Sequence, residues 1–305
     1  MDRPLHIETP TFENSTINAR LNKRIWLKME CYQPVGSFKI RGIGALCQQA
    51  VATGSKQLIS SSGGNAGFAA AYAGRQLGVP VKIIVPETTS ETARARMRAE
   101  GAEVIEHGAV WDEADQYARQ LVAERGAAYI HPFDDPAIWS GHATIMHEVA
   151  RQGEKPDVVI VAVGGGGLLS GVVEGMHDVG WDDVPVLAVE TEGAASFAAS
   201  VNAGELVRLP AITSIAKTLG ALQVTPQALH WSRLHPIQPV QVSDADAVDA
   251  CLRFADDLRV VVEPACGAAL SLLYRNRHHL DDYESALVIV CGGAGVTVGE
   301  LQVAS

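Results

Sequence analysis

The sequence has no pair of cysteines close enough to suggest a disulfide framework or a zinc site. Its five cysteines are spread through 305 residues without a C-x-x-C motif, at Cys31, Cys47, Cys251, Cys266 and Cys291. A chain of this length can bury a sizeable core and does not need disulfides to fold. We therefore expect free thiols and a reducing, cytoplasmic environment.

Long apolar segments and a surplus of positive charge are also missing. Residues 1–6 carry no secretory apolar run, and no segment approaches the roughly 20 apolar residues needed to span a bilayer. The chain has 24 Lys and Arg against 35 Asp and Glu, a formal net charge of −11. Because phosphate-rich surfaces would be repelled, we expect neither a nucleic acid nor a membrane as partner. His142, His147 and Glu148 lack the H-E-x-x-H spacing and make no case for a metal site.

Short apolar runs alternate with alanine-rich stretches of helical period along the chain. Helices are predicted at Ala66–Leu77 and Thr92–Glu100, and strands at Ile25–Glu30, Gln57–Ser60, Val81–Val85, Val158–Val163, Val186–Glu190 and Ala286–Cys291. This order predicts an α/β fold with parallel sheets covered by helices on both faces. The length fits one domain or two. Ligands of such sheets bind at the carboxyl ends of strands, so the glycine clusters there are the first candidates for a site.

Four consecutive glycines follow the predicted strand Val158–Val163 and open a helix. Residues 164–171, GGGGLLSG, can turn several backbone N–H groups toward one anion, and the helix adds its positive end. A phosphate could be held there without a lysine. A tight turn made of permissive residues is the alternative. A dinucleotide site, with Glu190 as its acidic residue, is less favoured because it leaves a second glycine cluster unexplained.

That second cluster, residues 61–67 with the sequence SSGGNAG, follows the predicted strand Gln57–Ser60 and also opens a helix. The Ser62 hydroxyl, the Asn65 amide and the backbone N–H groups can converge on a small carboxylate or a ring oxygen. A simple helix cap would explain Ser62 or Asn65 alone, but not the whole run.

A lysine stands at the start of another predicted helix, in the run Gly36–Gly42, where Ser37 is expected to be the N-cap. Lys39 is at the wrong end of a helix for its charge, and a surface position is the ordinary explanation. Its neighbours Phe38 and Ile40 favour burial, and a buried lysine near positive helix ends loses its proton more easily. A neutral amine is what Schiff-base chemistry needs.

These three motifs together resemble the fold-type II pyridoxal-phosphate (PLP) enzymes, the tryptophan synthase β-like superfamily. The similarity runs from about Leu5 to the C-terminus and is greatest to the short L-serine dehydratase and L-threonine deaminase branch. It is carried by residues 33–44 (QPVGSFKIRGIG), 70–80 (AAYAGRQLGVP), 132–136 (PFDDP), 262–269 (VEPACGAA) and 288–293 (VIVCGG).

The resemblance implies two open, twisted, mostly parallel sheets flanked by helices. A large PLP-binding domain would comprise residues 1–31 and 136–305, and a smaller mobile domain residues 32–135. The chain ends 14 residues after Cys291, so no regulatory domain and no feedback control by isoleucine are expected. By the same similarity the enzyme is expected to be a homodimer.

The resemblance also implies a role for each motif residue. Lys39 is expected to carry the cofactor as a Schiff base and to act as the catalytic base, with Ser62 as a second catalytic residue. Ser62, Gly63, Gly64 and Asn65 would bind the substrate carboxylate. The expected cofactor-binding residues are Phe38, against the ring, Asn65, at the 3′-oxygen, Cys291, facing the pyridine nitrogen, and the phosphate loop Gly164, Gly165, Gly166, Gly167 and Leu168. A monovalent cation such as K⁺ would be bound by Gly164, Glu190, Ala194, Leu219 and Ala221.

The implied reaction is the PLP-dependent elimination of water and ammonia from L-serine, giving pyruvate, and from L-threonine, giving 2-oxobutanoate. A neutral thiol at Cys291 leaves the ring a weaker electron sink, which favours elimination over transamination or racemisation. The cofactor phosphate would protonate the departing hydroxyl. Alternatives are a β-replacement enzyme of the cysteine synthase type and a non-catalytic PLP-binding homologue. Gly63 stands where some serine dehydratases have alanine, and is expected to add space near the substrate's β-carbon.

Overall fold

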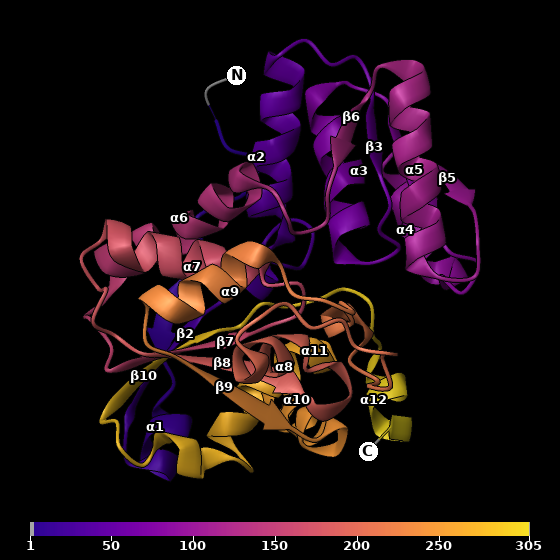
Figure 1. Ribbon diagram of the computed structural model, residues 1–305. Coiled ribbons are helices and arrows are strands. Elements are labelled where there is room, and N and C mark those ends of the chain that lie inside the picture. The colour runs from indigo at the N-terminus through magenta and orange to yellow at the C-terminus, as the bar shows by residue number, and fades with distance from the viewer. Residues whose placement is uncertain (1–2, 305) are drawn as a thin grey trace. The chain divides into compact units, whose positions relative to one another are not determined.

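The structure is a computed structural model that describes residues 3–304 of the 305-residue chain. The fold is mixed α/β with two mostly parallel sheets, as the sequence predicts (Figure 1). The chain divides into two compact units. Unit 1 comprises residues 1–7 and 33–141, and unit 2 comprises residues 8–32 and 142–305.

Unit 1 is built on a four-stranded parallel sheet with the order β5-β4-β3-β6. The strands are β3 (Leu58–Ser60), β4 (Val81–Val85), β5 (Glu103–Glu106) and β6 (Ala128–Ile130). The helices are α2 (Lys39–Ala52), α3 (Asn65–Leu77), α4 (Glu91–Ala99) and α5 (Trp111–Arg125). The sheet thus has β3 inside it, paired with β4 on one side and β6 on the other.

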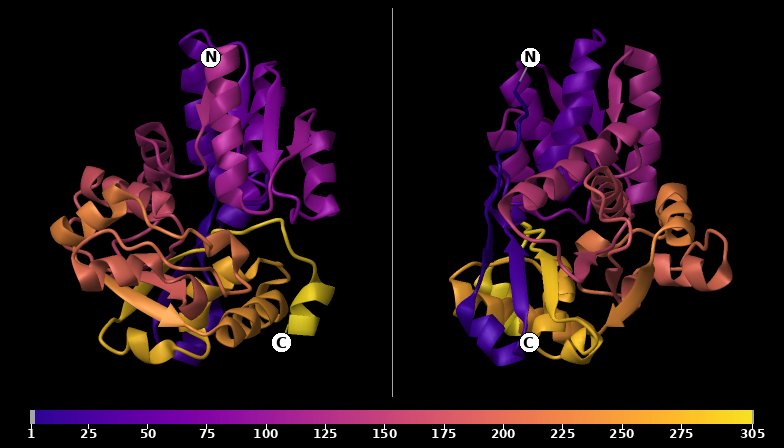
Figure 2. Two further views of the ribbon diagram at one scale, coloured as in Figure 1. Left: turned by 45° about the vertical axis from the view of Figure 1, so that its right-hand side comes forward. Right: turned by 90° about the vertical axis from the view of Figure 1, so that its left-hand side faces the viewer.

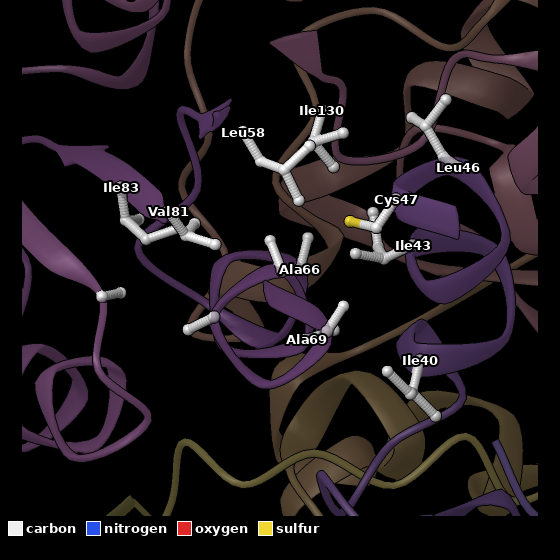
Figure 3. Close-up of a cluster of buried hydrophobic side chains, with 14 of the residues drawn as sticks. Ile40, Ile43, Leu46, Cys47, Leu58, Ala66, Ala69, Val81, Ile83 and Ile130 are labelled. Atoms are coloured by element: carbon white, nitrogen blue, oxygen red, sulfur yellow. The ribbon is translucent and has the colours of Figure 1, made fainter. Parts of the chain in front are cut away.

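The two faces of this sheet are covered by different helices because successive strand residues point to opposite sides. Leu58, Ile83 and Ile130 pack with the buried residues of α2 and α3 on one face, among them Ile43 and Ala69 (Figure 3). On the other face, Ile59 and Ile84 pack against Ala114, Ala118 and Leu121 of α5. The sheet is therefore a rigid platform on which the loop after β3 is held.

Unit 2 is built on a six-stranded sheet with the order β1-β2-β10-β7-β8-β9, in which, among the described strands, only β1 is antiparallel to its neighbour. Figure 2 gives two further views of the ribbon. Its strands are β1 (Thr11–Glu13), β2 (Arg24–Lys28), β7 (Val158–Ala162), β8 (Val186–Thr191), β9 (Ile237–Val242) and β10 (Ser285–Ile289). All residues of β7, β8 and β10 are buried, as expected for central strands covered on both faces.

Helices and single helical turns complete unit 2. They are α1 (Ser15–Leu21), the second half of α6 (Pro136–Gln152), α7 (Gly167–Asp178), α8 (Ser196–Ala203), α9 (Pro226–Leu234), α10 (Asp244–Leu258), α11 (Pro264–Leu270), α12 (Val298–Ala304) and the turns η1 (Glu30–Tyr32), η2 (Glu192–Ala194), η3 (Lys217–Leu219), η4 (Ser271–Leu273) and η5 (Arg277–Leu280). Helix α7 packs on β7, and α11 packs on β7 and β8.

The expected domain boundaries stay a prediction, and the compact units depart from them chiefly at the N-terminal segment and in helix α6. Residues before Glu8 belong to unit 1 because the Gln33 side chain pairs with both backbone polar groups of Ile7, at 3.0 Å and 2.8 Å, and Gln48 donates to Arg3 O. The second boundary follows Gly141, inside helix α6, instead of preceding Pro136.

One local prediction was wrong. Helix α2 begins at Lys39 with Phe38 at its N-cap position, and no side chain caps it. The Ser37 hydroxyl is buried and, within residues 3–304, has no hydrogen-bond partner.

In the same described range, no helix is both long and apolar enough to cross a membrane.

Candidate active site

The predicted site residues fall into two groups. Phe38, Lys39 and the loop Ser62–Asn65 belong to unit 1, whereas Gly164–Leu168, the predicted cation ligands and Cys291 belong to unit 2. Most of these residues follow the carboxyl ends of parallel strands or begin helices. Four of the predicted cation ligands differ: Glu190 lies in β8, Ala194 ends η2, Leu219 ends η3, and Ala221 lies in the loop after η3.

Lys39 is the first residue of α2 and its side chain is half-buried. The Nζ atom donates a hydrogen bond to Pro132 O at 2.7 Å and lies 5.2 Å from the centre of the Phe38 ring. Pro132 follows β6, so a backbone carbonyl just after the sheet and an aromatic ring together orient the amine. This arrangement holds the nitrogen on one side of the helix, at a fixed place in unit 1.

The loop Ser62–Asn65, which we call the serine loop, follows β3 and leads into α3. Ser61, at its base, is fully buried, while the four loop residues are half-buried. The Ser62 hydroxyl accepts a hydrogen bond from Gly64 N at 3.3 Å. Gly67 is required here, since a Cβ on it would lie 1.8 Å from Ser62 O. The first turn of α3 is therefore pressed against the loop backbone.

The position that a side chain at Gly63 would take is already filled, while the expected space near the substrate's β-carbon stays a prediction. A Cβ atom at Gly63 would stand 2.5 Å from Thr89 Oγ1 and 2.9 Å from its Cγ2. Thr89 lies in the turn between β4 and α4, far from Gly63 in sequence, so sequence reasoning could not place it there. The room that an alanine methyl would need is occupied by the threonine side chain.

The four-glycine turn connects β7 to α7 in unit 2. Gly166 has φ 90°, a conformation that favours glycine, and a Cβ on it would lie 2.6 Å from Ala228 Cβ. Gly165 O accepts a hydrogen bond from Thr225 N at 3.0 Å, which ties the turn to the N-terminal end of α9. Ser170 N donates to Gly166 O at 2.9 Å, and the N–H groups before it lie at the positive end of a 12-residue helix.

The structure brings part of the predicted cation site together. The position of a Cβ on Gly164 would be 3.2 Å from Leu219 O and 3.3 Å from Thr218 O, and Ala221 N donates to Leu219 O. The Glu190 carboxylate, at the end of β8, accepts hydrogen bonds from Phe197 N and Ala198 N, both at 2.8 Å. Burial raises the pKa of Glu190 to about 7, although these two hydrogen bonds oppose the rise.

Cys291 follows the central strand β10 and is 6% exposed. A hydrogen bond with Cys266, and then burial, raise the pKa of the Cys291 thiol well above its ordinary value. The thiol therefore stays protonated and uncharged at neutral pH. Gly292 and Gly293 after it have φ of 86° and 117°, and a Cβ on Gly293 would collide with the Glu263 side chain.

Comparison with known proteins decides the family. Residues 3–292 match the family described as pyridoxal-phosphate dependent enzyme. The chain belongs to this family. It is 48% identical to the L-serine dehydratase/L-threonine deaminase of Bos taurus, covering 98% of this chain and 94% of the relative. It is 43% identical to the L-serine dehydratase of Dictyostelium discoideum, covering 98% and 91%. A crystal structure of a fungal L-serine ammonia-lyase from Rhizomucor miehei superimposes with a TM-score of 0.95 at 41% identity, covering 99% of this chain and 98% of that one.

As a member of the pyridoxal-phosphate dependent enzyme family, the chain should contain residues that fit that cofactor, and it does. The four-glycine turn before α7 offers backbone N–H groups to a phosphate without a collision from any side chain of its own. Lys39 offers a primary amine that is held in place, and Cys291 offers an uncharged thiol.

Sequence reasoning missed the residues that support the serine loop in this pyridoxal-phosphate dependent enzyme. Asp115 and Tyr129 contact Ser61 through their side chains, and Thr89 lies against Gly63. Asp115 is one of several acidic residues on an amphipathic helix, and nothing in the sequence separates it from them. Only the packing of α5 on β3 shows its role.

Proposed function

We propose that this chain is a PLP-dependent ammonia-lyase that converts L-serine to pyruvate and ammonia, and L-threonine to 2-oxobutanoate and ammonia. The curated relatives named for these activities support the proposal over nearly the whole chain. The structural observation that carries it is the Lys39 amine, held 2.7 Å from Pro132 O in the same unit as the serine loop. A fixed amine and a loop rich in N–H groups are what an amino-acid substrate requires.

Each residue group has a distinct role in the proposal. Gly164, Gly165, Gly166, Gly167 and Leu168 bind the cofactor phosphate through backbone N–H groups, and Phe38 lies against the ring. Ser62, Gly63, Gly64 and Asn65 bind the substrate carboxylate, and the Asn65 side chain also binds the 3′-oxygen. When bound, the cofactor withdraws electrons from the substrate's α-carbon. The Lys39 amine then removes the proton from that carbon as a general base.

Cys291 decides between reaction outcomes in this proposal. Its protonated thiol carries no negative charge. It therefore would not stabilise a protonated pyridine nitrogen in the cofactor, as an aspartate would. The site therefore favours prompt loss of the β-hydroxyl over the slower proton exchange that racemisation requires.

The decisive experiment replaces Lys39. We expect Lys39→Ala to lose both the visible absorbance of the bound cofactor and the formation of pyruvate from serine. Lys56→Ala is the matched control, because Lys56 is an exposed lysine of the same unit. Pyruvate formation by Lys39→Ala at the wild-type rate would refute the proposal.

Product analysis separates the proposed lyase from a β-replacement enzyme. The wild-type protein is incubated with serine in the presence and absence of sulfide. A lyase forms pyruvate and ammonia in equal amounts in both samples, whereas a replacement enzyme forms cysteine only when sulfide is present. A non-catalytic binding homologue would form neither product.

We also propose that K⁺ binds beside the phosphate loop, with Gly164, Glu190, Ala194, Leu219 and Ala221 as its ligands. The proximity of Gly164 to Leu219 O supports this assignment, as does the buried Glu190 carboxylate, whose charge a cation would balance. Glu190→Gln should lower the activation by KCl relative to tetramethylammonium chloride. Equal activation of the wild type and the variant would contradict the site.

Two further proposals concern the enzyme's setting. We place it in the cytoplasm, since all five cysteines are free thiols. We propose a homodimer on the basis of the family resemblance. Sedimentation of the purified protein, which would give a mass near 32.3 kDa for a monomer and twice that for a dimer, tests the second proposal.

A further inference from the structure

We propose that Asp115 is a positioning residue for the substrate carboxylate, acting through Ser61 at the base of the serine loop. The inference rests on the proposed function because it takes the serine loop as the carboxylate-binding element. Asp115 does not belong to that loop; it lies on α5, more than 50 positions further along the chain.

The Asp115 carboxylate is the centre of a partly buried hydrogen-bond network in unit 1. Ser61 Oγ donates to Asp115 Oδ1 at 2.7 Å, and the Tyr129 hydroxyl donates to the same oxygen. Arg119 Nε donates to Oδ2 at 2.8 Å, and the Arg119 guanidinium lies 4.3 Å from the centre of the Tyr129 ring. Asp115 is only 9% exposed, and both of its carboxylate oxygens accept hydrogen bonds from side chains of the protein.

The network keeps a negative charge at Asp115. Burial raises the pKa of the Asp115 carboxyl, but hydrogen bonds from Tyr129, Arg119 and Ser61 outweigh it, and the pKa lies below its ordinary value. An ionised carboxylate accepts hydrogen bonds roughly twice as strongly as a neutral group. Ser61 is therefore anchored by a charge-assisted bond, while Arg119 balances the charge.

Ser61 transmits this anchoring to the serine loop because the chain leaves it little freedom. Its neighbour Ser60 donates through Oγ to Ile130 O at 3.0 Å, which fixes the end of β3. On the other side, the carbonyl of Ser62 is in close contact with Gly67 of α3. The direction of the Ser62 N–H and hydroxyl groups thus depends on where Ser61 is held.

The Lys39 amine is held by hydrogen bonds other than those of Asp115, although the Tyr129 ring contacts His131 edge-on, with 5.9 Å between the ring centres. Its acceptor, Pro132 O, lies in a turn that the His131 ring stabilises by accepting from Phe133 N and Asp134 N at 3.2 Å and 2.7 Å. Asp115 takes no part in those bonds. Loss of Asp115 should therefore affect substrate binding more than proton removal.

The test is a double-mutant cycle between Ser61→Ala and Asp115→Asn. An asparagine has the same shape, but its NH₂ group must face one of the donors now bound, so the anchor is weakened. We expect each single variant to raise KM for serine about tenfold with kcat changed less than about twofold, the pattern of lost uniform binding. The double variant should be no worse than the poorer single variant. Glu124→Gln, an exposed carboxylate on the same helix, is the matched control and should match the wild type.

A second measurement is independent of turnover. Hydrogen exchange of the backbone N–H groups of residues 61–66 should speed up in Ser61→Ala and Asp115→Asn but not in Glu124→Gln. If Asp115→Asn does not fold, Tyr129→Phe serves in its place, because it leaves the carboxylate and removes a hydroxyl that contacts both Asp115 and Ser61. Additive effects in the cycle, an unchanged KM or unchanged exchange would each overturn the inference. Failure of the wild type to act on serine would instead overturn the proposed function, and the exchange result would stand on its own.

Discussion

Thr89 occupies the space into which a side chain at Gly63 would project, with its Oγ1 atom 2.5 Å from the ideal Cβ position. The two residues lie in different loops of unit 1, one after β3 and one after β4. The threonine side chain at position 89 therefore fills the volume that a methyl group at position 63 would need. Such a methyl group would compete with Thr89 for the same space.

This pairing predicts the result of Gly63→Ala. Gly63 is not among the glycines with positive φ, so alanine fits the backbone, and the three atoms nearest to its Cβ would all belong to Thr89. We expect Gly63→Ala to lower the free energy of unfolding by about 1–3 kcal/mol, as overpacking does, and to raise KM for serine. Gly63→Ala/Thr89→Ala should recover most of both losses, with Thr89→Ala alone as the control. No recovery in the double variant would disprove the pairing.

The buried thiol of Cys47 predicts a loss of stability in alkaline solution. Burial raises the pKa of Cys47 to about 12, whereas an unfolded thiol has its ordinary value near 9. The folded state thus keeps a proton that the unfolded state loses. The stabilisation is complete below pH 9 and declines as the pH rises toward 12, by about 1.4 kcal/mol per pH unit for this thiol. Denaturant unfolding of wild type and Cys47→Ala between pH 7 and pH 10, with reductant present, should show a shallower decline in the variant.

A buried ion pair in unit 2 predicts unequal costs for single and double replacements. Lys28 Nζ lies 2.7 Å from the Glu148 carboxylate, and the two side chains are 0% and 6% exposed. Lys28→Met should lower the free energy of unfolding by about 3–5 kcal/mol, because it leaves a buried carboxylate without its cation. Lys28→Met/Glu148→Leu should be more stable than Lys28→Met. A double variant that is less stable than the single one would show that the hydrogen bonds around the pair matter more than its charges.

Cys291 can be tested by replacements that differ in charge. Cys291→Ser keeps an uncharged group that can pair with Cys266, so we expect kcat for serine elimination to stay within about tenfold of the wild type. Cys291→Asp would place a carboxylate in a buried position near Glu263, whose charge already raises the pKa of the Cys291 thiol. We expect that variant to lose most elimination activity. Assays for pyruvate and for D-serine with both variants check this, and equal activity of the two would show that the uncharged state is unimportant.

Much of the fold follows from local patterns in the sequence. The run Val158–Val163 is apolar at every position, and the structure places it in the buried strand β7. Helix α3 starts one residue before its predicted start and ends at Leu77, because glycine at position 78 takes the left-handed conformation that ends a helix. Such signals lie within a few residues of the element that they specify.

The remaining features depend on residues that are distant in sequence. Ser37 has the chemistry of a cap, but Phe38 takes the N-cap position, so α2 starts one residue later than expected. The sequence suggests space at Gly63 because it does not show that Thr89 lies beside it. Asp115 resembles the other acidic residues of its helix, and only the packing of α5 on β3 shows its contact with Ser61. The motif residues Lys39, Ser62 and Cys291 could be singled out as candidates because their neighbours form recognisable sequences, and their roles stay predictions. The residues that contact the serine loop, Thr89, Asp115 and Tyr129, could not be predicted, because a single contact between residues distant in sequence leaves no recognisable sequence motif.

The order of strands in unit 2 constrains how this protein can be made. Strand β10 is near the end of the chain, yet it lies inside the sheet and pairs with both β2 and β7. Until residues 285–289 leave the ribosome, β1-β2 and β7-β8-β9 are two separate pieces with unpaired edges. Nascent chains shorter than this should therefore depend on chaperones to cover those edges.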